Sequence, residues 1–276
     1  MSKLYELSYR TNINVYTFRN THIIVYDDHR TLLNILFEAK KFGEFPETPN
    51  LVYFDLHDDA CMLLPKSQLL ERMEVKDFSE ATSKQFWSFV EFDLGVLDDD
   101  WLLTGMELGL IKDAILIGQV ENHHIQDMNY RYKSEDGVEH ELYSISHLRY
   151  SLGGRGCLGD NIIKEPYYQN VRDIMQYHQR KFDGGGVKPF VLDFDLDCFT
   201  TKCQEKTYAW PEDIFRQEYI ESHNVRSFME NQLNRASFIT ICREPGCCGG
   251  IGEANKILNY LDRYFFDGAL RTEPIS

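Results

Sequence analysis

The stretch LVYFDLHDD at residues 51–59 decides how this chain folds. Its apolar, β-prone first half leads directly into the polar sequence DLHDD. Upstream, THIIVY at 21–26 has the same character and ends just before DDH at 27–29, and a segment with helical spacing of apolar residues, 30–43, lies between the two runs. A strand, a helix and a second strand over this length are typical of one βαβ unit, so we expect the two strands to be parallel.

Later segments repeat this alternation. The runs AILIGQV at 114–120, PFVLDFDL at 189–196 and ASFITIC at 236–242 are typical of buried parallel strands, whereas 101–111 and 251–266 have helical patterns. No internal repeat or linker interrupts the series. The sequence therefore predicts a single three-layer α/β/α domain with a mostly parallel sheet over residues 1–276.

The composition limits the classes of function. The 276 residues carry 29 Lys and Arg against 44 Asp and Glu, a formal net charge of −15, which argues against nucleic acid as a partner. No apolar run reaches the roughly 18 residues of a membrane span, and the N-terminus lacks the apolar core of a signal peptide. The seven cysteines form no C-x-x-C pair and indicate reduced thiols. We expect a cytoplasmic protein with no membrane partner; its oligomeric state stays open.

Two of the apolar runs end in closely spaced carboxylates. The first, third and fifth residues of DLHDD would share one side if the strand continued, and the three aspartates of DFDLD at 193–197 alternate in the same way. Like charges about 4 Å apart repel by roughly 4 kcal/mol at an effective dielectric near 20, so such a cluster requires raised pKa values or a bound cation. Carboxylates mixed with imidazole suit Mn, Mg or Fe, and their number indicates two ions.

These motifs resemble those of the ureohydrolases, the family of arginase and agmatinase. DLHDD at 55–59 is similar to the family's D-A-H-x-D motif, FDLD at 194–197 is similar to F-D-x-D, and the DH at 28–29 is similar to the D-H that supplies the first metal histidine. The order along the chain also matches, and the resemblance covers about residues 22–260. It looks closest to a divergent branch that includes peptide arginases, which convert arginine in ribosomally made peptides to ornithine.

The resemblance implies an arginase-like fold, two Mn²⁺ ions per chain and a ligand set carried over position by position. One ion would be bound by His29, Asp55, Asp59 and Asp195, and the other by Asp55, His57, Asp195 and Asp197, with Asp55 and Asp195 bridging. The family usually continues its second motif to D-x-x-D-P, whereas CFT at 198–200 follows here.

Further residues are candidates for the catalytic groups. Glu244 follows the run 236–242, in the order where the family places the carboxylate that holds the guanidinium group; the alternative is a surface Glu before Pro245. His123 and His124, after AILIGQV, are candidates for the proton donor to the leaving amine, and an exposed pair of loop histidines is the alternative.

The segment after Asp59 bears on the substrate. Enzymes of the family that act on free arginine carry Ser, Asn and a His-Gly segment there, which grip the α-amino and α-carboxylate groups, whereas this chain has ACMLLPKSQLLERMEVKDF. We therefore predict an arginine-containing precursor peptide as partner, with peptidyl arginine converted to peptidyl ornithine and urea. The alternatives are a small-molecule ureohydrolase acting on arginine or agmatine, a metal-dependent deacetylase, and a non-catalytic peptide-binding module on the same fold.

Overall fold

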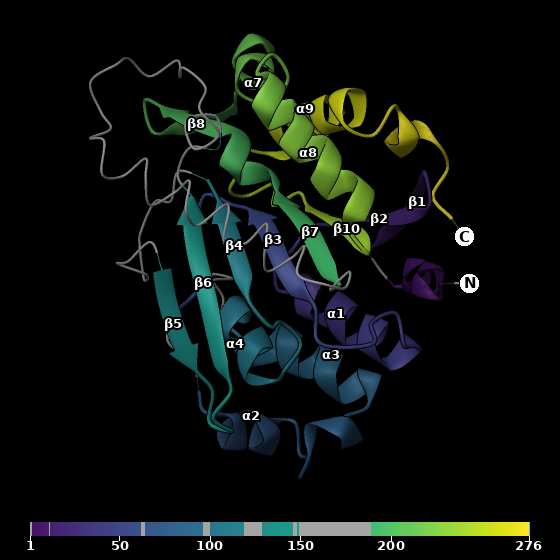
Figure 1. Cartoon of the computed structure of the whole chain (residues 1–276), viewed down its shortest axis with the longest axis vertical. Helices are drawn as coiled ribbons and strands as arrows, with labels where there is room; N and C mark the ends of the chain where they lie inside the picture. Colours follow the sequence, from purple (N-terminus) through teal and green to yellow (C-terminus); the bar gives the residue numbers. More distant parts are fainter. Residues whose placement is uncertain are drawn as a thin grey trace.

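The computed structural model of the chain describes residues 2–10, 12–61, 64–95, 100–118, 129–145, 148 and 189–275. Within these residues, eight strands form one sheet in the order β1-β2-β10-β7-β3-β4-β6-β5 (Figure 1). The strands are β1 (Asn14–Phe18), β2 (Thr21–Tyr26), β3 (Asn50–Phe54), β4 (Ala114–Ile117), β5 (Asn129–Lys133), β6 (Glu139–Ile145), β7 (Phe190–Asp195) and β10 (Phe238–Cys242).

Strand order decides where the polar ends of the strands meet. The six strands from β2 to β6 are mutually parallel, and the outer strands β1 and β5 are antiparallel to their neighbours. The predicted mostly parallel sheet is therefore confirmed. The late strands β10 and β7 lie between β2 and β3, so the carboxyl ends of these four strands lie side by side.

Helices cover both faces of this sheet (Figure 1). One side carries α1 (Thr31–Phe42), α3 (Ser83–Phe92) and α4 (Trp101–Glu107), with α2 (Lys66–Arg72) at its margin. The other carries α7 (Glu212–Tyr219), α8 (His223–Arg235) and α9 (Ile251–Tyr264). The three-layer architecture predicted from the sequence is thus confirmed, whereas its extent as a single domain over 1–276 stays a prediction.

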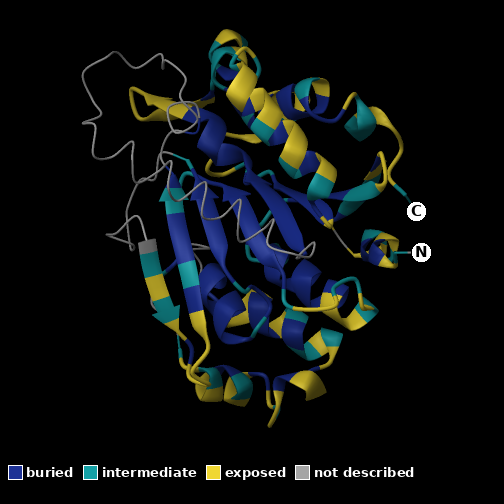
Figure 2. Ribbon diagram, viewed as in Figure 1, coloured by how far each residue is buried: buried dark blue, intermediate teal, exposed yellow. Residues whose placement is uncertain are grey.

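Two apolar cores hold the layers together, one on each side of the sheet. The first includes Phe37 and Trp101, and the second includes Phe194 and Phe215, each no more than 3% exposed. Burial of one such side chain contributes about 1.5–3 kcal/mol. Figure 2 shows the central strands as buried along their length, as expected for parallel strands covered on both faces.

Some local details differ from what the sequence patterns indicate. Strand β3 ends at Phe54, so DLHDD does not continue it; the backbone N–H of His57 donates to the Asp55 carboxylate, and Asp59 has a left-handed backbone with φ of 48°. The helix expected over 101–111 ends at Glu107, because Gly109 adopts a φ of 66°. Two short strands, β8 (Thr200–Cys203) and β9 (Lys206–Ala209), form a hairpin that the sequence did not suggest.

Two further expectations concern membranes and thiols. Among the described residues, every helix is too short or too polar to cross a membrane. The cysteines in this part of the chain are all free, as predicted: Cys61, Cys198, Cys203, Cys242, Cys247 and Cys248.

Candidate metal centre

The polar residues singled out in the sequence meet at the carboxyl edge of the sheet. Asp195 is the last residue of β7, and Asp55 directly follows β3. Strands β7 and β3 are hydrogen-bonded neighbours in the sheet. His29 lies in the turn between β2 and α1, and Glu244 lies two residues after β10. Asp197 lies in a 3₁₀ turn (Leu196–Phe199) that follows β7 directly. Parallel strands bring these sites together, since all their carboxyl ends point the same way.

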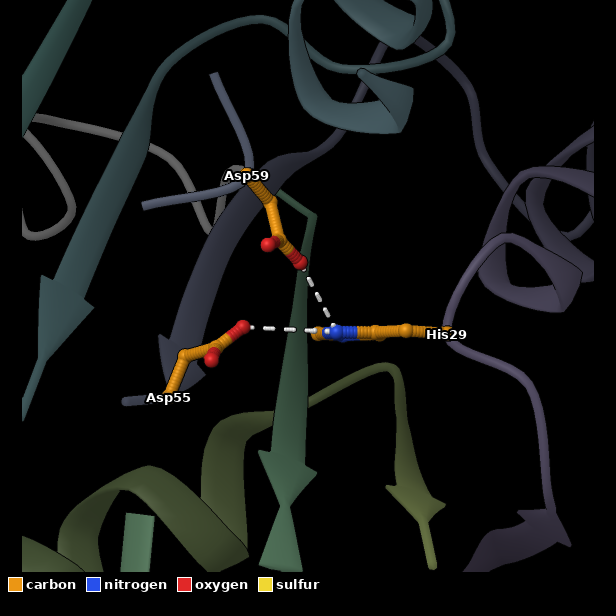
Figure 3. A group of neighbouring side chains, drawn as sticks. All are labelled: His29, Asp55 and Asp59. Carbon is orange, nitrogen blue, oxygen red and sulfur yellow. Dashed lines mark ion pairs between the residues drawn. The ribbon is translucent and has the colours of Figure 1, made fainter. Parts of the chain in front are cut away.

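One group of ligand atoms surrounds the His29 ring. Its Nδ1 lies 3.3 Å from Oδ2 of Asp55, 3.0 Å from Oδ2 of Asp59 and 3.0 Å from Oδ2 of Asp195. Figure 3 shows Asp55 and Asp59 turned toward this nitrogen. All four side chains are buried, with at most 5% of any residue exposed. The four residues that the resemblance implies for one ion therefore lie around a single point.

A second group lies beside the first. Nδ1 of His57 is 3.1 Å from Oδ2 of Asp197 and 3.8 Å from Oδ1 of Asp55. Ligand atoms of Asp55, His57 and Asp197 all lie within 4.8 Å of one another. Asp55 thus contributes to both groups. The His57 side chain is one third exposed, so this side of the cluster faces solvent.

The carboxylates point one oxygen outward and one inward. Their outer Oδ1 atoms accept backbone hydrogen bonds, from His57 to Asp55 at 2.8 Å and from Leu56 to Asp197 at 3.2 Å. The inner atoms differ, because Oδ2 of Asp55 and Nδ1 of His29 are buried with no hydrogen-bond partner among the described residues. An unpaired buried polar atom costs about 1–3 kcal/mol. The arrangement therefore fits a cation, which these inward atoms would ligate.

The electrostatics of the cluster agree with this fit. Burial, together with Asp59 and Asp195, raises the pKa of Asp55 well above its usual value. Burial and the neighbouring Asp197 do the same to the pKa of Asp195. The hydrogen bond to Asp197 raises the pKa of His57 to about 9. Positive charge is therefore favoured at the centre of the cluster, and oxygen with imidazole nitrogen is a donor set for hard or borderline divalent ions.

Glu244 lies at the edge of the same cluster and not on the surface. It is 9% exposed, and one of its carboxylate oxygens lies within 4.8 Å of the ligand atoms of His29 and Asp195. Its φ of 32° is unusual for a side-chain-bearing residue, and its carbonyl accepts from the N–H groups of Cys247 and Cys248, both at 3.0 Å. Burial raises the pKa of Glu244 to about 7. Strain in a tight turn thus places a buried carboxylate beside the candidate metal centre.

Other residues of the site were not assigned from the sequence. Asp193 stands on the alternating aspartate face but received no role, and Trp101, Tyr26 and Thr240 each donate a hydrogen bond to an aspartate of the site. Only Tyr26 carried a signal, as the last residue of the strand before DDH. The candidate proton donors His123 and His124 lie outside the described residues.

Comparison with known proteins concerns the fold. No protein-family model and no curated protein matches the chain. Among solved structures, it is similar to proclavaminate amidino hydrolase from Streptomyces clavuligerus, at 9% identity and a TM-score of 0.41, covering 90% of this chain but only 63% of that one. It is also similar to Helicobacter pylori arginase, at 12% identity and a TM-score of 0.40, covering 95% of this chain and 76% of that chain.

Proposed function

We propose that the protein is a hydrolase of guanidino groups that uses two divalent cations, and that these cations are Mn²⁺. The observation that carries this proposal is the set of buried, inward-pointing ligand atoms at four neighbouring strand ends, with Glu244 beside them. The ligands proposed for one ion are His29, Asp55, Asp59 and Asp195, and those for the other are Asp55, His57, Asp195 and Asp197.

Different residues of the chain would perform different steps of this hydrolysis. When bound, a pair of divalent ions supplies a water of lowered pKa as nucleophile at neutral pH. Glu244 would hold the guanidinium group, because a carboxylate accepts paired hydrogen bonds from its planar fork. Since guanidinium stays protonated to a pKa near 13.8, its carbon is already electrophilic. Attack at that carbon breaks a C–N bond and yields urea and an amine, with His123 or His124 as the proposed proton donor to the amine.

The substrate that we propose is arginine within a peptide. Helix α2, which follows Asp59 by a few residues, supports it, because the N–H groups of Lys66 and Ser67 donate to Glu107 and Glu135. Glu135 precedes β6, at the amino edge of the sheet and therefore at the opposite end from the cluster. From α2 onward, this segment therefore lies away from the cluster. The net charge of −15 favours attraction of a cationic peptide, although such steering is nonspecific.

The number of carboxylates weighs against the deacetylase alternative. A single-ion deacetylase site would need a D-x-H motif plus one more aspartate, whereas Asp59 and Asp197 are both present in the cluster and both buried. The presence of two overlapping groups that share Asp55 favours two ions.

Urea release tests the proposal. The Mn²⁺-loaded protein would be assayed with a blocked peptide containing an internal arginine, with free arginine and with agmatine, with Glu244→Gln as the blank. We expect kcat/KM for the peptide to exceed that for free arginine by orders of magnitude, because binding energy would come from the peptide backbone. Faster hydrolysis of arginine or agmatine would make the protein a small-molecule ureohydrolase. Peptide binding without urea from any substrate would make it a binding module.

A further inference from the structure

Asp193 is a buried carboxylate directly behind the candidate metal centre. It lies in the middle of β7 and is 0% exposed. Oδ1 accepts from the hydroxyl of Tyr26 at 3.0 Å and from the hydroxyl of Thr240 at 2.5 Å. These donors come from β2 and β10; β10 is adjacent to β7 in the sheet, and β2 is the next strand beyond β10. Because both bind Oδ1, the orientation of the carboxylate is determined, and Oδ2 points to one partner among the described residues.

That partner is the ring of His29. Nε2 of His29 lies 2.9 Å from Oδ2 of Asp193, whereas Nδ1 on the other side of the ring faces the cluster. A carboxylate accepts a hydrogen bond and cannot donate one, so Nε2 carries a proton in this contact. In the neutral ring, the lone pair is then on Nδ1, which is buried without a hydrogen-bond partner. This is the form of histidine that ligates a cation.

We propose that Asp193 is a positioning residue that sets the affinity of one cation through His29. It would hold the proton on Nε2, fix the plane of the ring and increase the basicity of Nδ1, as carboxylates behind metal-binding histidines do in general. The inference rests on the cation site of the proposed function, which it deepens. It adds a residue that ligates no ion yet governs one of the two.

The two ligand groups of the cluster differ in their contact with Asp193. Asp193 reaches the cluster through His29, a proposed ligand of one ion only. His57, the proposed ligand of the other, meets Asp197 and Asp55 through its Nδ1, and its side chain is one third exposed. Loss of the Asp193 carboxylate should therefore weaken one ion much more than the other, whereas general damage to the fold would affect both.

The experiment measures stepwise Mn²⁺ binding to the full chain by calorimetry, with free Mn²⁺ counted by electron paramagnetic resonance. Asp193→Asn removes the charge and keeps an acceptor for Nε2, and Asp193→Ala removes both. Asp262→Asn is the matched control, because Asp262 is equally buried but binds Leu270 and Arg271 instead. Thermal unfolding of the metal-free variants reports the loss of fold stability separately from the loss of binding.

We expect one of the two ions to bind about 10- to 100-fold more weakly in Asp193→Ala, with a smaller loss in Asp193→Asn and the second ion retained. The control should bind both ions as the wild type does. Two ions bound with unchanged affinity in both Asp193 variants would overturn this inference and leave the proposed function standing. An equal loss of both ions would also overturn it, since Asp193 would then be structural. A wild-type protein that binds no Mn²⁺ would overturn both proposals.

Discussion

The indole Nε1 of Trp101 donates a hydrogen bond to Oδ2 of Asp59, the same oxygen that faces His29. The next residue of helix α4, Leu102, donates its N–H to the carbonyl of Asp59 at 3.2 Å. The ring of Trp101 also lies 4.5 Å from that of His29, measured between centroids. The first turn of α4 therefore holds both the side chain and the left-handed backbone of Asp59, so the apolar core on this side of the sheet supports the candidate metal centre directly.

Trp101→Phe should weaken cation binding at the His29 group, because Asp59 loses the donor that orients it. By analogy with other groups that orient metal ligands, we expect about a 10-fold or greater loss of Mn²⁺ affinity. Mn²⁺ should also quench the fluorescence of the wild type through Trp101, and the variant should lose this quenching. Trp87→Phe is the control, since Trp87 binds Glu38 away from the cluster. Equal quenching in both variants would place the ion elsewhere.

Asp195→Ala should abolish binding of both Mn²⁺ ions. Asp195 contacts His29 at 3.0 Å, and its other oxygen accepts from the N–H of Asp197, so it adjoins both proposed ligand groups. Metal analysis of the desalted variant gives the count directly. About two ions are expected for the wild type, and full occupancy in the variant, or a single tight zinc in the wild type, would contradict the two-manganese assignment.

Glu244→Gln should retain both ions and the fold but lose most turnover. The amide keeps the shape of the side chain, whereas the charge that would pair with guanidinium is lost, and hydrogen bonds to charged groups contribute about 1.5–3 kcal/mol. We expect kcat/KM for urea release to fall by roughly 10- to 100-fold or more. Near-native kinetics would place the guanidinium site away from Glu244.

Stability of the metal-free protein should depend on pH through Glu244. The fold raises the pKa of this carboxyl from 4.5 to about 7, so its stabilising contribution is complete below pH 4.5 and is lost as the pH rises through about 7. At about 1.4 kcal/mol per pKa unit, the wild type should lose up to about 3 kcal/mol relative to Glu244→Gln over this range. Urea denaturation of both proteins in EDTA, from pH 4.5 to 8, measures the difference. A difference that does not change with pH would contradict a buried Glu244.

Much of the fold was predictable because its signals are local. Apolar runs such as THIIVY need only neighbouring residues to define a strand, and the observed β2 has the same bounds, Thr21–Tyr26. The path of DLHDD was not predictable, because it depends on a side chain that bends its own backbone, Asp55 accepting from the N–H of His57. Helix α4 ended earlier than its pattern suggested, since the left-handed Gly109 follows it closely.

The sequence by itself determined that carboxylates and histidines would follow several apolar strands, because residue type and alternation are written along the chain. Only the tertiary structure decided which of them meet. Insertion of β7 and β10 between β2 and β3 pairs Thr240 with Asp193 across the sheet and brings His29 to the other side of the same carboxylate. The contact between His29 and Asp193 joins residues more than 160 positions apart, and it follows from strand order, which no local pattern encodes. This contact distinguishes Asp193, which lies behind His29, from the aspartates that face the cluster.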